Sequence, residues 1–140
     1  MDLKLELEGL FRLLIAVGLA FPIGYERELT HKPAGLRTHM LIALGSAALT
    51  YASLEGFPGS DPARVAAYVV AGIGFVGAGA IIREKAKVVG ITTAASLWIS
   101  ASIGLSSGAG LYLTASATSI LGYIILSTKS VKVSLFRKKK

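Results

Sequence analysis

The sequence has no cysteine, which excludes disulfide bonds and thiolate metal sites. Charged residues are also scarce, at 16% of the 140 residues, whereas soluble domains carry about 25%. The two histidines, His31 and His39, lie in or beside one polar segment, and their spacing does not predict a metal site. Serine hydrolysis inside a membrane would need a serine and a histidine at comparable depth. We therefore expect no catalysis, no metal centre and no cofactor.

Hydrophobic residues dominate the chain instead, at 53%, and the mean hydropathy is +0.63. Five apolar spans predict an all-α integral membrane bundle of five transmembrane helices. The spans cover residues 10–25, 40–54, 63–82, 91–105 and 109–126. Several are shorter than the usual range of about 17–25 residues, so the second and fourth need polar flanks near the interfaces or a locally thinner bilayer. Residues 106–108, Ser-Ser-Gly, predict the turn between the last two spans.

The basic residues predict the orientation. Twelve of the fifteen Lys and Arg residues fall on one side of the predicted bundle. They are Arg27, Lys32, Arg37, Arg83, Lys85, Lys87, Lys129, Lys132, Arg137, Lys138, Lys139 and Lys140. The positive-inside rule places this side in the cytoplasm, and five crossings then put the N-terminus outside. We expect residues 1–128 to form the membrane domain and residues 129–140 a short basic cytoplasmic tail. The net charge of +7 thus needs no nucleic-acid partner.

The third span carries a stripe of small residues at helical spacing, which predicts the close approach of another helix. Its members are Ala67, Ala71, Gly74 and Ala78. We interpret this span as the central helix of the bundle and its small-residue face as the contact of a homodimer. The span also contains the letters of the dinucleotide fingerprint at residues 72–77. That fingerprint requires a strand, a turn and a helix N-terminus in water, so we expect no nucleotide site here.

The densest polar segment follows the first span, at residues 22–39. Pro22 and Gly24 are expected to weaken the end of the first helix. The topology places this segment at the same membrane depth as the start of the fourth helix, which predicts a ligand or partner site at the cytoplasmic mouth. Its candidate residues are Glu26, Arg27, Arg37, Thr38, His39, Thr92 and Thr93. An anionic headgroup, a nucleotide phosphate or a partner carboxylate would suit it; the alternative is a salt-bridge network that holds the first two helices in register.

Hydroxyl side chains form rows on the last two helices, with Thr92, Thr93, Ser96 and Ser100 on the fourth. Such rows either line a polar path or form hydrogen bonds between helices. On the outer side, Asp61 and Arg64 are candidates for a polar pair. The outer carboxylates either form a weak surface for divalent cations or are scattered surface acids.

Several sequence blocks, in order, resemble the signature of the MgtC/SapB family. They lie at residues 26–28, 32–39, 61–64, 72–79, 90–98 and 108–112. The resemblance implies a five-helix bacterial inner-membrane protein linked to survival in low magnesium and, in pathogens, inside phagocytes. It also implies an action on membrane energetics, including restraint of the proton-driven ATP synthase, rather than transport of Mg²⁺. Many members append a cytoplasmic ACT-like domain, whereas a short basic tail is expected here.

We therefore expect a non-enzymatic, homo-oligomeric protein of the bilayer that modulates membrane energetics or ion homeostasis through another complex such as the ATP synthase. The middle of each span has no ionisable side chain, which weighs against an ion-coupled pump. The alternative is a channel or carrier for Mg²⁺ or another small solute, with the hydroxyl rows as its path.

Overall fold

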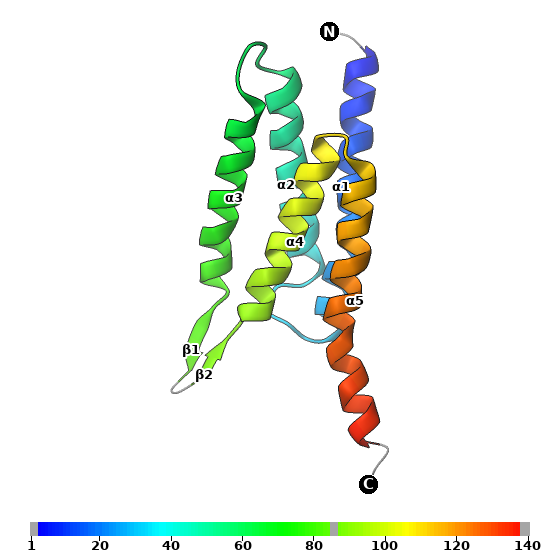
Figure 1. Ribbon diagram of the computed structural model, residues 1–140, viewed down its shortest axis with the longest axis vertical. Helices are drawn as coiled ribbons and strands as arrows, with labels where there is room; N and C mark the ends of the chain where they lie inside the picture. Colours follow the sequence, from blue (N-terminus) through cyan, green and yellow to red (C-terminus); the bar gives the residue numbers. More distant parts are fainter. Residues whose placement is uncertain (1–2, 85–86, 138–140) are drawn as a thin grey trace.

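The computed structural model describes residues 3–84 and 87–137, and within them the chain forms five helices and one short β-hairpin (Figure 1). The elements are α1 Leu3–Leu29, α2 Leu36–Glu55, α3 Pro62–Gly79, β1 Ile82–Glu84, β2 Lys87–Val89, α4 Ile91–Gly108 and α5 Tyr112–Arg137. The prediction of a helical bundle is confirmed, and each predicted span overlaps one helix. The hairpin, in which Ile82 pairs with Val89, was not predicted.

Successive helices run in opposite directions between two ends of the bundle (Figure 1). One end, named here the Glu26 end, holds the α1–α2 connection, the hairpin and the C-terminal part of α5. The opposite end, named the Asp61 end, holds the start of α1 and the α2–α3 and α4–α5 connections. The basic loops grouped by the sequence analysis therefore lie at one end of the molecule.

Local sequence explains where the helices begin and end. Asp61 caps α3, because its Oδ1 accepts a hydrogen bond of 2.9 Å from the Ala63 amide, and Pro62 occupies the first turn, where no amide hydrogen is needed. Residues 106–108, predicted as a turn, instead form the last turn of α4. The chain reverses just beyond them, where Gly110 adopts a φ of 79° that a residue with a Cβ rarely adopts.

Pro22 and Gly24 were expected to weaken the end of the first helix, but α1 remains helical through both residues and continues to Leu29. Proline removes one backbone hydrogen bond, and the buried residues on both sides of Pro22 hold the helix together by packing. Gly24 serves a different purpose, because a Cβ added there would lie 2.8 Å from the Cα of Leu36. The glycine thus allows the start of α2 to pack closely against α1.

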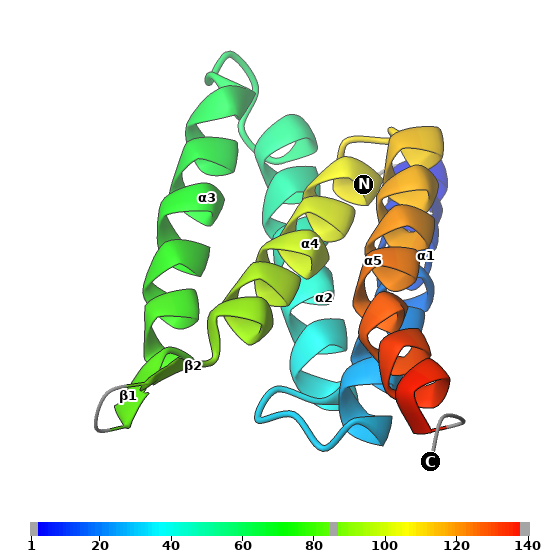
Figure 2. The same cartoon turned by 60° about the horizontal axis from the view of Figure 1, so that its bottom comes forward.

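Small side chains fill the contact between α1 and α2, and the rest of the core also contains buried leucine and isoleucine. Ala16 and Ala20 of α1 and Ala43 and Ala47 of α2 have no exposed surface. Small residues let helix backbones approach one another, which is how membrane helices associate without a hydrophobic driving force. Helix α4 contacts all four other helices and is the central helix of the bundle (Figure 2). The prediction that the third span is central is therefore wrong.

Helix α3 lies at the edge of the bundle (Figures 1 and 2). Its buried residues are Ile73 and Gly77, and Gly77 faces Ala94 of α4. The predicted small-residue face, Ala67, Ala71, Gly74 and Ala78, points elsewhere: its three alanines are exposed, and a Cβ added at Gly74 would meet no neighbour within 4 Å. This face is not used for packing within one chain, because the bundle contacts α3 through a different side.

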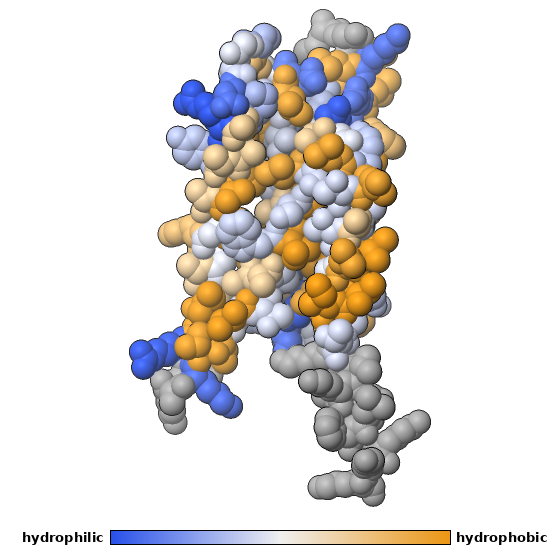
Figure 3. All heavy atoms as spheres, viewed as in Figure 1, coloured by the Kyte–Doolittle hydropathy of each residue, from blue (hydrophilic) through white to orange (hydrophobic). Residues whose placement is uncertain are grey.

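Large apolar side chains cover the outside of the bundle. Phe75 is 85% exposed and Leu113 is 86% exposed. Hydrophobic residues occupy much of the middle of the face shown in Figure 3, and hydrophilic ones gather towards its two ends. Apolar surface on this scale is typical of a membrane protein rather than a soluble one. Among the described residues, α1 and α3 are long and apolar enough to cross a bilayer.

Helix α5 extends well beyond residue 126, where the fifth span was predicted to end. Its backbone remains helical to Arg137, so the helix includes most of the segment predicted as a basic tail. Lys138, Lys139 and Lys140 lie outside the described residues.

Candidate functional site at the Glu26 end

The short α1–α2 connection is fixed to both helices that it joins. The Lys32 amide donates a 3.0 Å hydrogen bond to the Arg27 carbonyl, and His31 adopts a φ of 53° in the turn. Glu28 accepts a 2.8 Å hydrogen bond from the amide of Leu36. Helix α2 has no side-chain cap from its own N-cap residue, so Glu28 of α1 performs that role. The connection therefore holds Arg27 and Lys32 in defined positions.

Two adjacent charged residues are buried in the last turns of α1. Glu26 is 9% exposed and Arg27 is 4% exposed. Arg27 Nη1 lies 3.3 Å from Glu26 Oε2, whereas Arg27 Nε is buried and has no hydrogen-bond partner among the described residues. A guanidinium carries five N–H donors in one plane, so a single contact leaves much of its capacity unused. A buried, unused donor on a charged group is costly, and this makes Arg27 the first candidate for contact with a ligand.

His39 is fully buried and joins α2 to α4. Its Nδ1 lies 2.8 Å from the Gly35 carbonyl oxygen, and its Nε2 lies 3.0 Å from Ser96 Oγ. A carbonyl oxygen can only accept, so Nδ1 carries a hydrogen and donates it. Both ring nitrogens are thus occupied inside the bundle, and His39 acts as a bridge between helices.

The start of α4 supplies backbone donors. Gly90, the N-cap residue, has a φ of 93° and offers no side-chain cap. A Cβ at this position would collide with the Ala80 carbonyl oxygen, so the close approach of the chain to the end of α3 requires glycine. The first turn of a helix has amide hydrogens without partners inside the helix. Thr92 and Thr93 lie in this turn; Thr92 is exposed, and Thr93 is 3% exposed.

These parts enclose a cleft of about 730 Å³, named here the basic cleft. It is lined by Arg27, Lys32, Val88, Val89, Gly90, Ile91, Thr92, Thr93, Ile125, Leu126 and Thr128. This lining contains two cationic side chains and no carboxylate. Helix α4 starts beside the hairpin and points the N-terminal end of its axis towards the Glu26 end (Figure 1). The arrangement favours a ligand that accepts hydrogen bonds and carries negative charge.

The structure brings together some of the predicted site residues and separates others. Arg27, Thr92 and Thr93 line one cleft, although they are more than sixty positions apart in the sequence. Arg37 is exposed and Thr38 is half-buried, and neither lines the cleft. Successive helical residues are separated by about 100°, so Arg37 faces almost opposite to the buried His39.

Two lining residues with polar side chains, Lys32 and Thr128, were absent from the predicted site. Lys32 belongs to the polar segment that was singled out, and its charge was the available signal. Thr128 was placed beyond the expected end of the fifth helix, so its helical position was not foreseen.

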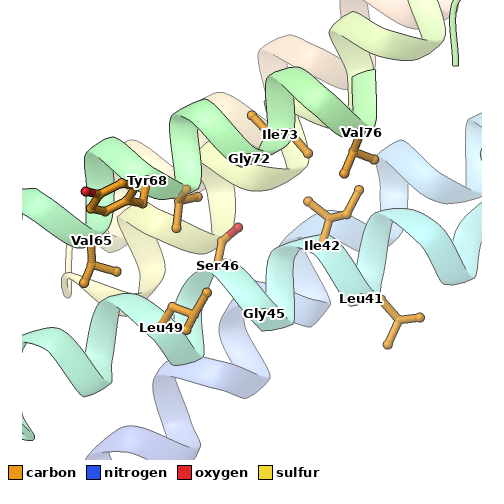
Figure 4. A pocket seen from close by; sticks show the side chains of 11 residues that line it. Leu41, Ile42, Gly45, Ser46, Leu49, Val65, Tyr68, Gly72, Ile73 and Val76 are labelled. Atoms are coloured by element: carbon orange, nitrogen blue, oxygen red, sulfur yellow. The ribbon is translucent and has the colours of Figure 1, made fainter. Parts of the chain in front are cut away.

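A second cavity, of about 440 Å³, lies between α2 and α3 (Figure 4). It is lined by Leu41, Ile42, Gly45, Ser46, Leu49, Val65, Tyr68, Val69, Gly72, Ile73 and Val76. Gly45 and Gly72 leave room there, since a Cβ added at either would meet no neighbour within 4 Å. The lining has no charged group, so this groove suits an apolar chain rather than an ion.

The Asp61 end contains other polar contacts. Asp61 and Arg64 are both exposed, and the Asp61 side chain accepts from the Ala63 amide rather than forming the predicted pair with Arg64. Arg12 pairs with Glu8, and its Nη1 donates a 2.7 Å hydrogen bond to the Gly108 carbonyl oxygen. Within residues 3–84 and 87–137, no group of three or more His, Cys, Asp or Glu side chains is placed to hold a metal ion.

The fold and this site define a helical membrane protein whose tightly packed bundle carries a basic cleft at one end. The model of the MgtC family matches residues 13–134. The chain belongs to the MgtC family, which confirms the resemblance found in the sequence.

Three relatives illustrate the similarity. The chain is 42% identical over 127 residues to the "Putative magnesium transporter YhiD" of Escherichia coli strain K12, a match that covers 85% of this chain and 59% of that protein. It is 47% identical over 98 residues to "Protein MgtC" of Brucella abortus strain 2308, covering 70% of this chain and 41% of the relative. It is 46% identical over 112 residues to "Protein MgtC" of Salmonella typhimurium strain 14028s, covering 80% and 48%. The chain thus spans about half the length of these relatives, and no solved structure matches it.

Proposed function

We propose that this protein supports bacterial adaptation to low magnesium by modulating another complex of the inner membrane, and that it does not carry Mg²⁺ itself. The link to magnesium rests on the MgtC family and on the name of the YhiD relative, which describes a magnesium transporter. The main observation that favours a regulatory role over transport is the close packing of the bundle interior. Ala16, Ala20, Ala43 and Ala47 are fully buried where α1 and α2 meet.

The contact between α2 and α4 leaves little room for a hydrated ion. A Cβ added at Gly104 would meet the Ala43 carbonyl oxygen and would lie 2.8 Å from the Cβ of Ser46. A Cβ added at Gly108 would lie 2.5 Å from the Ala47 carbonyl oxygen. Mg²⁺ gives up its water reluctantly and prefers octahedral oxygen ligands at about 2.0–2.1 Å. Passage between these helices would therefore require separation of backbones that are in contact.

The partner in this proposal is another membrane complex, with the proton-driven ATP synthase as the first candidate. The proposed topology has five crossings in the inner membrane, the Glu26 end in the cytoplasm and the N-terminus outside. The proposed assembly is a homodimer in which α3 contributes Ala67, Ala71, Gly74 and Ala78. Two points support this dimer: the small-residue face of α3 is not covered by other helices of the same chain, and small residues commonly mediate contacts between membrane helices.

A channel or carrier for Mg²⁺ is the second candidate, and one observation favours it. Ser100 and Ser107 on α4 have buried hydroxyl oxygens with no hydrogen-bond partner among the described residues. With Thr93 and Ser96 they form a row of buried hydroxyls along the central helix. Hydroxyl oxygens can replace part of the hydration shell of an ion, although they carry no charge to attract a divalent one.

Flux measurements on the purified full chain separate the two candidates. The protein is reconstituted into sealed liposomes that enclose a fluorescent Mg²⁺ indicator, and Mg²⁺ is added outside with an imposed membrane potential. We expect entry no faster than into protein-free liposomes, while a known magnesium channel reconstituted in parallel gives a clear signal.

Protein-dependent flux that Glu26→Gln abolishes would overturn the regulatory proposal and establish a transporter with a gate at the Glu26 end. A parallel test uses a bacterium that lacks its MgtC-family protein. In that strain we expect the chain to restore growth in low magnesium without raising the initial rate of magnesium uptake.

A further inference from the structure

We propose that the basic cleft binds an anion through a phosphate group, and that Arg27, Lys32 and the first turn of α4 hold it. The first observation is the state of Arg27. Its side chain is 5% exposed and lines the cleft, yet its buried Nε has no partner in the part of the chain that the structure describes. A guanidinium matches the geometry of phosphate oxygens, so an anion in the cleft would supply Arg27 with acceptors beyond its single contact with Glu26.

The second observation is the N-terminus of α4, which forms another wall of the same cleft. The first bond of the helix runs from the Ala94 amide to the Gly90 carbonyl, at 2.8 Å, so the amides of residues 91–93 precede the helical ladder. Gly90 supplies no side-chain cap for them. Free amide hydrogens and the positive end of the helix dipole favour a negatively charged group at this position.

Charge and shape identify the class of ligand. Lys32 adds a second cation. The two carboxylates next to Arg27 in the sequence are both outside the lining, because Glu26 pairs with Arg27 and Glu28 accepts a hydrogen bond from the Leu36 amide. A free Mg²⁺ would therefore meet two cations and no acidic ligand. The cleft is larger than one phosphate needs, and Val88 and Ile125 give it apolar walls. A phosphate with an organic portion fits this combination, either in an anionic lipid headgroup or in a soluble phosphate compound.

The purified full chain in detergent micelles allows a direct test. Isothermal titration calorimetry measures binding of inorganic phosphate at constant ionic strength, with chloride as the reference anion. Native mass spectrometry of the same sample measures retained phosphatidylglycerol against diacylglycerol, which lacks the phosphate. We expect saturable binding of at least one of the two phosphate probes.

Three substitutions distinguish binding in the cleft from nonspecific binding to basic residues. Lys32→Gln removes a cleft cation and should weaken binding about tenfold. Arg83→Gln removes a cation from β1, an exposed residue at the same end of the bundle but outside the lining, and should change binding less than about twofold. Glu26→Gln removes the carboxylate that competes for Arg27, so binding should become tighter by about threefold or more.

Each outcome has a definite meaning. Binding of inorganic phosphate with this pattern of variants identifies a soluble phosphate compound as the ligand source, and binding of phosphatidylglycerol alone identifies the membrane. Absence of binding for both probes, or equal effects of Lys32→Gln and Arg83→Gln, would overturn the proposal. Weaker binding in a Glu26→Gln protein with native helix content would also overturn it. If that variant does not fold, the comparison of Lys32→Gln with Arg83→Gln decides alone.

Discussion

Gly104 gives the sharpest test of how this bundle is held together. The residue lies on α4 where the helix crosses α2, and a Cβ there would meet the Ala43 carbonyl oxygen and the Cβ of Ser46, the latter at 2.8 Å. Contacts of this kind normally begin at about 3.4 Å. Gly104→Ala therefore adds a single methyl group at a place where only a shift of one helix can accommodate it.

The cost follows from that shift. Moving two packed helices apart by about 0.5–1 Å forfeits a quarter to a half of the dispersion energy of each atom pair at the contact. The fully buried Ala43 and Ala47 lie along this contact, so several pairs are affected together. Overpacking in a dense core typically costs about 1–3 kcal/mol, and we expect about 2–3 kcal/mol here.

Gly45→Ala on α2 is the matched control. It makes the same chemical change in a neighbouring helix, but the added Cβ would meet no atom within 4 Å. Alanine is the better helix former by about 0.5–1 kcal/mol, so this variant should be neutral or slightly stabilised. The assay is reversible unfolding in mixed micelles of dodecyl maltoside and sodium dodecyl sulfate, followed by circular dichroism. Equal unfolding free energies for the two variants would refute the close contact between α2 and α4.

Two further predictions concern other contacts of the bundle. Ser96→Ala should lower the unfolding free energy by about 1 kcal/mol in the same assay, because His39 Nε2 loses its partner on α4. The control Ser102→Ala removes only a local hydrogen bond within an exposed part of α4 and should change the unfolding free energy by less than about 0.5 kcal/mol. Equal losses in the two variants would contradict the His39 bridge between helices. Gly74→Leu should shift the proposed homodimer to monomer in light scattering without lowering the stability of the monomer, since a Cβ at Gly74 meets no neighbour. The control Gly18→Leu, at an equally open position on α1, should leave the dimer intact. A dimer unchanged by Gly74→Leu would exclude the α3 contact.

The number and order of the helices were predictable from the sequence, because each of the five apolar runs overlaps one helix. The ends of the helices were less predictable. Helix α1 begins at Leu3, well before the predicted span, because Leu, Lys and Glu at residues 3–8 are good helix formers even though the charged ones interrupt the apolar run. The β-hairpin was missed because each strand is only three residues long and its pairing depends on the ends of α3 and α4.

The candidate site was predicted in part. Proximity of Arg27 to Thr92 and Thr93 followed from topology alone, because both loops belong to the same end of the bundle. The grouping of Arg37 with His39 was wrong because two positions along a helix differ by about 200°, so Arg37 is exposed where His39 is buried. A signal was present: His39, Ala43, Ser46 and Thr50 recur at helical spacing and form the buried face of α2.

The third span was wrongly predicted to be the central helix. A stripe of small residues indicates a face that another helix can approach closely, but it does not indicate whether that helix belongs to the same chain. Both α3 and α4 carry such residues, and only the arrangement of all five helices shows which is enclosed. Thr93, Ser96, Ser100 and Ser107 lie on the buried face of α4 together with several small residues, whereas Thr92 and Ser102 are exposed. Small and hydroxyl side chains on one face are typical of a membrane helix that packs against other helices.

The alanine contact between α1 and α2 responds to substitution differently from a typical soluble core. In a soluble core of leucine and phenylalanine, most damaging substitutions remove volume. Here Ala16, Ala20, Ala43 and Ala47 are already fully enclosed, and glycine is the sole smaller residue. Every substitution at these positions other than glycine enlarges the side chain, so this part of the bundle is constrained against larger residues rather than against smaller ones.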